Sequence, residues 1–249
     1  MRWTLSLAIA LLAAAMTQAT AQAQAPAPAG PIYVAAYAEV GTSSIKDGTA
    51  LLKQFRDAVR KEDGNIGAYV AQEVSRANRF LILEIWKDQA AFDAHGKSAA
   101  TTAFGDKFKE FQNAPLDVRV HNGMAVVDSP AAGTDALVVA SHVDVPPPRK
   151  DELVTALNPL AVDSRKVPGN QRFEVWQQTN RPNHFTVVEA WRGQRAYDAR
   201  GSAAPQRCSC RASASRSITP DITSPTSVRP ASRRSNGPFP TGTSTWAPP

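Results

Sequence analysis

Two residues of this chain, Trp86 and His95, have side chains that could take part in acid–base chemistry and in binding a substrate. They lie in the segment Glu84-Ile-Trp-Lys-Asp-Gln-Ala-Ala-Phe-Asp-Ala-His95. An imidazole titrates near neutral pH and serves as a general base or a hydrogen-bond donor. An indole offers a flat apolar wall and one N–H donor. We therefore predict a site in which His95 is the base and Trp86 lines the pocket.

Three weaker candidates for orienting a substrate are Tyr37, Asn78 and Phe92, through a hydroxyl, an amide and an aromatic ring. Structural roles compete with these functional ones. Trp86 sits at the end of an apolar stretch and would also fit a core or barrel-closing position. His95 could be a polar residue near a helix end, and Tyr37 could face solvent or a subunit contact. Glu84 is expected to make a structural hydrogen bond or ion pair.

The sequence predicts no metal site and no bound cofactor. The four histidines, at positions 95, 121, 142 and 184, do not show the spacing of metal ligands. The two cysteines, Cys208 and Cys210, have no second pair or nearby histidine, so we interpret them as incidental thiols.

The chain repeats itself at a fixed spacing of 105 residues without a gap. Ile32–Val40 matches Leu137–Val145, and Glu84-Ile-Trp86 matches Glu189-Ala-Trp191. A period this long indicates two duplicated domains of one fold rather than a solenoid. His95 corresponds to Arg200, so a catalytic site is expected in the first copy.

The first copy, residues 31–128, predicts the order β-α-β-β-α-β. Strands are expected at 32–40, 66–75, 80–86 and 116–127, with a hairpin connection at 76–79. Apolar residues at helical spacing predict one helix within 46–63. A second helix follows a cap at Asp88, breaks at Gly96 and ends at Pro115. This order is the split ferredoxin-like arrangement, an α+β fold.

The second copy, residues 135–204, follows a short linker at 129–134 and looks incomplete. Strands are expected at 171–179 and 184–191, with helices at 149–165 and 194–204. From Pro205 the chain turns to Ser, Thr, Pro and Arg, with eight prolines in its last 45 residues. That composition predicts a disordered tail over 205–249. The abrupt loss of similarity suggests out-of-frame translation, and a genuine disordered extension is the alternative.

The two ends of the chain differ in composition from the repeats. Residues 1–29 resemble a signal peptide and leader, with Arg2, an apolar run from Leu5 to Met16 and small residues for cleavage. This predicts a periplasmic or secreted protein, with an uncleaved anchor as the alternative. The formal net charge is +6, but six arginines and one aspartate of the tail supply five of those charges. The mixed charge of the repeats does not favour nucleic acid.

The Glu84-to-His95 segment resembles the antibiotic biosynthesis monooxygenase domain family of dimeric α+β barrels, over residues 31–127 and again over 136–204. The resemblance implies a two-sheet barrel with a pocket between sheet and helices. For some members it implies oxygenation of quinols or phenols by O₂ without metal or flavin. A small aromatic substrate is then the expected partner, and the two repeats would pair within one chain or the chain would form a homodimer.

Two other functions remain open at this point. Resemblance to a haem-degrading relative of the same fold group would require an asparagine on the first strand. Ile32–Val40 contains none, which disfavours haem chemistry. A non-catalytic or stress-related module could use the barrel pocket for a small apolar ligand. The fold alone does not decide between an enzyme and such a module.

Overall fold

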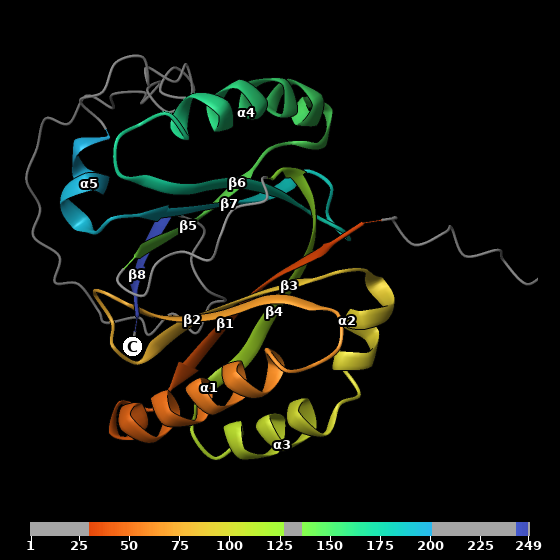
Figure 1. Ribbon diagram of the computed structural model, residues 1–249, viewed down its shortest axis with the longest axis vertical. Coiled ribbons are helices and arrows are strands. Elements are labelled where there is room, and N and C mark those ends of the chain that lie inside the picture. The colour runs from red at the N-terminus through yellow and green to blue at the C-terminus, as the bar shows by residue number, and fades with distance from the viewer. Residues whose placement is uncertain (1–29, 127–135, 201–242, 249) are drawn as a thin grey trace, which may run out of the picture.

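The computed structural model describes residues 30–126, 136–200 and 243–248 (Figure 1). The expected signal peptide and leader, the 129–134 linker and most of the tail lie outside these ranges.

The first repeat has the predicted element order. Its strands are β1 (Ile32–Val40), β2 (Asn65–Glu73), β3 (Arg79–Trp86) and β4 (Gln112–Ala125). Its helices are α1 (Ile45–Val59), α2 (Gln89–His95) and α3 (Ala99–Phe108), and the short 3₁₀ turn η1 (Thr42–Ser44) precedes α1. The prediction that Pro115 ends a helix is wrong, because α3 stops at Phe108 and Pro115 lies inside β4.

The second repeat follows the same order as far as the structure describes it. It comprises β5 (Leu137–Asp144), η2 (Pro147–Arg149), α4 (Lys150–Ser164), β6 (Asn170–Gln178), β7 (His184–Trp191) and α5 (Gln194–Ala199). One more strand, β8 (Thr243–Ala247), comes from the end of the chain.

The eight strands close into one barrel in the order β1-β3-β2-β8-β5-β7-β6-β4. The repeats contribute one half each, with their helices on the outside (Figure 1). Each strand alternates its side chains between the helix-facing side and the barrel interior. On β1, for example, Val34 and Ala36 join the core under α1 and α3, whereas Tyr33 and Tyr37 point into the interior. The chain therefore pairs its two repeats internally.

The expectation of a disordered tail is wrong for Thr243–Ala247. These residues form β8, which lies between β2 and β5, and Trp246 is only 2% exposed. Trp246 pairs with Val138 on one side and with Glu73 on the other. In the first repeat His121 has the corresponding pairings, with Tyr33 and Gln178. The tail thus supplies the fourth strand that the second repeat otherwise lacks.

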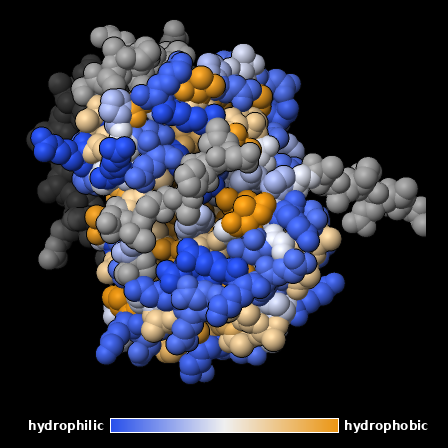
Figure 2. All heavy atoms as spheres, in the orientation of Figure 1, coloured by the Kyte–Doolittle hydropathy of each residue, from blue (hydrophilic) through white to orange (hydrophobic). Residues whose placement is uncertain are grey.

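The visible face of the molecule is mostly hydrophilic, with hydrophobic residues in small separate groups (Figure 2). Across the described residues, the large apolar side chains that stay exposed are Ile66, Val74, Val118 and Val162. None of the described helices combines the length and the apolarity that crossing a membrane requires.

Candidate functional site

The end of β3 fixes the first two residues of the site. Glu84 and Trp86 lie two positions apart on one strand, so both side chains project from the same face. That face is the helix-covered one, and both residues are buried, with exposures of 4% and 0%. The indole Nε1–H of Trp86 donates to Oε2 of Glu84 over 3.0 Å. The pair is therefore held together before any neighbouring helix contributes.

A glycine and a helix cap bring α2 against this strand end. Asp88 caps the helix, accepting a hydrogen bond from the backbone N–H of Ala91 over 2.8 Å. Gly64, with a φ of +80°, passes so close that a Cβ there would lie 2.6 Å from Cβ of Ala91. Only glycine allows both this backbone conformation and this approach. As a result, the last residue of α2, His95, lies over Trp86.

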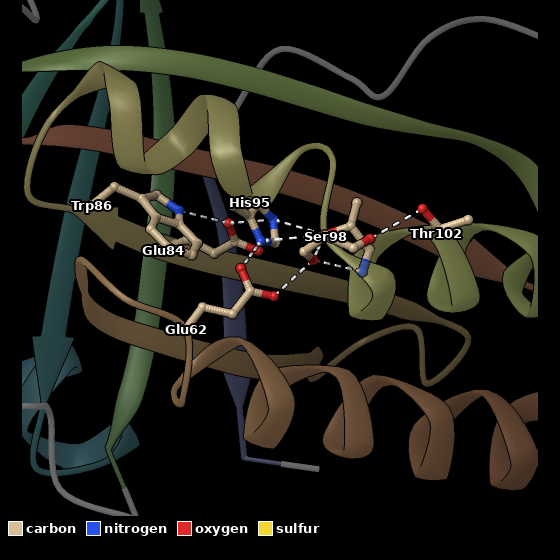
Figure 3. A network of polar contacts seen from close by, with 7 residues as sticks. Glu62, Glu84, Trp86, His95, Ser98 and Thr102 are labelled. Carbon is tan, nitrogen blue, oxygen red and sulfur yellow. Dashed lines mark hydrogen bonds and ion pairs between the residues drawn. The ribbon is translucent and has the colours of Figure 1, made fainter.

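The imidazole of His95 lies between two carboxylates (Figure 3). Its Nδ1 is 2.9 Å from Oε2 of Glu62, and its Nε2 is 3.4 Å from Oε2 of Glu84. The ring stacks on Trp86 with 4.5 Å between centroids. Side chains from the α1–β2 turn, β3 and α2 therefore form one connected polar chain, Glu62–His95–Glu84.

Hydroxyl groups complete the Glu62 end of this chain. Ser98 caps α3 and donates from Oγ to Oε1 of Glu62 over 2.8 Å. Oγ1 of Thr101 lies 3.2 Å from Nδ1 of His95. Both oxygens of the Glu62 carboxylate are thus engaged, which fixes its orientation toward the imidazole.

Burial raises the pKa of Glu84 above its ordinary value, and this effect outweighs the opposing influence of His95 and the hydrogen bond from Trp86. Nearby Glu62 adds to the rise. Within the described residues, no group of three or more His, Cys, Asp and Glu side chains is arranged to hold a metal ion.

A pocket of about 450 Å³ opens beside Glu62, at one end of the polar chain Glu62–His95–Glu84. Ala90, Ala91 and Ala94 of α2 form its apolar part. Its polar lining consists of Glu62, His95, Ser98, Asp88, Asp63 and Lys87. The volume lies within the usual range for small-molecule sites.

The structure brings together some of the predicted site residues and separates others. His95 and Trp86 are in contact, and the Phe92 ring lies 6.3 Å from that of His95 while packing against the core. Trp86, however, does not line the pocket as predicted, because it is fully buried beneath His95. Its indole supports the imidazole instead.

Tyr37 and Asn78 do not belong to this site. Tyr37 points into the barrel interior, on the opposite face of the sheet from Trp86, where its ring meets His142 and Trp246. Asn78 donates from Nδ2 to the Val40 carbonyl, joining the β2–β3 connection to the end of β1. Asn183 makes the same contact to Val145 in the second repeat, which indicates an architectural role.

The second repeat keeps the strand-end pair and loses the rest. Trp191 donates to Glu189 over 2.9 Å, and burial raises the pKa of this carboxyl as well. At the His95 position stands Arg200, whose Nε lies 3.9 Å from Glu189. The position of Glu62 is taken by Val167. The Glu–Trp pair is thus common to both repeats, whereas the Glu62–His95–Glu84 arrangement is confined to the first repeat.

Sequence reasoning missed Glu62 and Ser98, and for Glu84 it favoured a structural role over a catalytic one. Glu62 and His95 are 33 positions apart and no local motif links them. A signal was nevertheless available, since both positions change together between the two copies. Sequence reasoning also missed a third Glu-x-Trp unit, Glu174-Val-Trp176, in which the indole donates to Glu174 over 2.9 Å in the barrel interior.

The fold and the site together define a ferredoxin-like α+β barrel whose two halves come from tandem repeats in one chain. The family model for antibiotic biosynthesis monooxygenases matches residues 31–114 and 136–207, more than half of the chain. The protein belongs to this family, as its sequence resemblance suggested.

Individual relatives agree with this assignment. The chain is 33% identical over 87 residues to a candidate monooxygenase, YcnE of Bacillus subtilis (strain 168); the match covers 35% of this chain and 92% of that protein. A solved structure of a candidate monooxygenase from Fusobacterium nucleatum superposes with a TM-score of 0.64 at 18% identity, covering 71% of this chain and 82% of that one. An anthrone oxidase-like protein superposes with a TM-score of 0.59 at 14% identity, covering 88% and 91%. These structural similarities concern the fold.

Proposed function

We propose that this protein is a monooxygenase that uses O₂ to oxygenate an electron-rich phenol or quinol, without a tightly bound cofactor. The observation that carries the proposal is the buried imidazole of His95, held between Glu62 and Glu84 beside a pocket of suitable size. Membership of a monooxygenase family supports the reaction class.

The chemistry asks three things of the protein. It must remove a hydroxyl proton, because the resulting phenolate passes an electron to O₂ far more readily than the phenol does. It must hold the aromatic ring, and it must limit access of water to the reacting atoms. The Glu62–His95–Glu84 chain supplies the acceptor of the proton, and the alanine surface of α2 supplies an apolar contact for the ring.

For a hydroquinone the balanced reaction gives a hydroxyquinone and water. One atom of O₂ enters the ring and the other leaves as water. The substrate supplies all four electrons, so no external reductant is consumed. Trp86 has a positioning role, since its ring stacks on His95 and its N–H orients Glu84.

The direct test is oxygen consumption by the full-length protein with a panel of hydroquinones, in buffer containing a chelator. We expect His95→Ala to lower kcat/KM by about 100-fold or more, the usual contribution of general acid–base catalysis. Arg200→Ala is the matched control at the equivalent position of the second repeat and should leave the rate unchanged. Ligand binding without oxygen consumption would instead identify a binding module.

A further inference from the structure

We propose that Glu62 is the residue that receives the hydroxyl proton of the substrate, and that His95, held from behind by Glu84, orients the Glu62 carboxylate for this step. The inference rests on the proposed function and specifies which atom meets the substrate. In this step the phenolic O–H bond breaks and an O–H bond forms on the Glu62 carboxylate. The electron pair stays on the phenolate oxygen, and no oxidant is involved.

Exposure singles out Glu62 among the three groups. Its side chain is 19% exposed, against 7% for His95 and 6% for Glu84. All three belong to one polar chain, yet a molecule in the pocket reaches its Glu62 end first. Of the two carboxylates, only Glu62 is among the residues lining the pocket.

The two ring nitrogens of His95 are poorly placed to meet the substrate directly. Nδ1 contacts Glu62 and Thr101, and Nε2 faces Glu84. A base needs a lone pair within hydrogen-bond distance of the proton that it removes. For His95 this would require displacing a carboxylate, whereas an oxygen of Glu62 only needs to exchange its hydrogen bond from Ser98.

The internal repeat offers an independent comparison. The second copy retains the Glu–Trp pair with nearly the same geometry, at 2.9 Å against 3.0 Å. It replaces Glu62 with Val167, His95 with Arg200 and Ser98 with Ala203. Glu62 is thus lost together with the imidazole and the serine that contact it, as expected if the three act as one unit.

The charge of the pocket indicates which form of the substrate binds. Its ionisable lining includes the carboxylates of Glu62, Asp63 and Asp88 and the single amine of Lys87, which lies 3.5 Å from Asp63. An anion entering this pocket would be repelled by the carboxylates of Glu62, Asp63 and Asp88. The substrate is therefore a neutral phenol or quinol that ionises only after it has bound.

The first experiment compares Glu62→Gln with Glu110→Gln, the same change at an exposed carboxylate outside the pocket. Rates are measured by oxygen uptake with hydroquinones of graded acidity. For weakly acidic substrates we expect Glu62→Gln to lower kcat/KM by about 100-fold. The loss should shrink as the substrate becomes acidic enough to ionise in water, and Glu110→Gln should remain within about twofold of the unaltered protein. An equal loss for every substrate would show that Glu62 only positions His95, and would overturn the inference.

The second experiment does not depend on turnover. Binding of 4-nitrophenol, a phenol that O₂ does not oxidise readily, is titrated on either side of the phenol's own pKa. The unaltered protein should prefer the neutral form, and Glu62→Gln should weaken this preference by about tenfold, the usual value of one hydrogen bond to a charged group. An unchanged preference would refute the role of Glu62. Absence of oxygen uptake by the unaltered protein, with normal binding, would refute the oxygenase function instead.

Discussion

The four buried tryptophans of the described residues allow a quantitative test of how this fold is held together. Trp86, Trp176 and Trp191 each donate an indole N–H to the glutamate two positions earlier, at 3.0, 2.9 and 2.9 Å. Trp246 is equally buried, but its Nε1 has no hydrogen-bond partner among the described residues. Replacement by phenylalanine removes the same atoms in every case, so the cavity contribution is similar and the difference reports the hydrogen bond.

We expect the Trp→Phe change at the three paired positions to destabilise the protein by about 1–3 kcal/mol more than Trp246→Phe. That is the penalty for leaving a buried acceptor unsatisfied. The loss at Trp176 should be the smallest of the three, because Glu174 also accepts a hydrogen bond from Arg172 over 2.8 Å. The loss at Trp191 should be the largest, because the next partner of Glu189, Nε of Arg200, lies 3.9 Å away, whereas Glu84 also has Nε2 of His95 at 3.4 Å.

Urea unfolding of the full-length variants, with free energies compared at equal m-values, measures these differences. A double-mutant cycle with Glu189→Gln and Trp191→Phe isolates one pair. Equal destabilisation at all four positions would refute the reasoning, because it would mean that the indole–carboxylate bonds add nothing beyond packing.

Three further predictions concern the backbone, pH and the loops. Gly64→Ala should destabilise by about 1–3 kcal/mol through a strained φ and a clash, measurable by urea unfolding; Gly105→Ala, with open space in α3, should instead stabilise by about 0.5–1 kcal/mol. Burial lowers the pKa of His121 and of His142 from 6.5 to about 4, so stability present above pH 6.5 should be lost as the pH falls toward 4. For His121 this amounts to about 2 kcal/mol at pH 5, and His121→Gln should flatten the pH dependence of the urea midpoint. Asn78→Ala should destabilise the protein by about 1 kcal/mol, because the hydrogen bond to the Val40 carbonyl is lost, and should leave kcat/KM unchanged in the oxygen-uptake assay. A rise in KM would instead show that Asn78 contacts the substrate.

Much of the fold could be predicted from the sequence because the two repeats show the same pattern of apolar residues and turns. The strand and helix order, the cap at Asp88 and the meeting of Trp86 with His95 all followed from periodicity, capping and the family resemblance. The two faces of β1 could also have been separated by its alternation of side chains, which places Tyr37 opposite the helices.

The parts that could not be predicted depend on contacts distant in the sequence. Glu62 reaches His95 only because Gly64 lets the α1–β2 turn approach α2. The strand at Thr243–Ala247 is short and follows a segment rich in Ser, Pro and Arg, so its own composition does not predict a strand. It forms where β2 and β5 offer unpaired edges and the interior accepts the indole of Trp246, which is tertiary context rather than local propensity.

The central claim is that this protein inserts one oxygen atom from O₂ into a phenolic substrate by means of the Glu62–His95–Glu84 chain. The most direct measurement is turnover of a hydroquinone under ¹⁸O₂ in chelator-treated full-length protein, with mass spectrometry of the quinone product. We predict one ¹⁸O atom in each product molecule, and loss of this product in His95→Ala. Product whose added oxygen comes from water, release of H₂O₂ in place of oxygenation, or labelling that persists in His95→Ala would contradict the account.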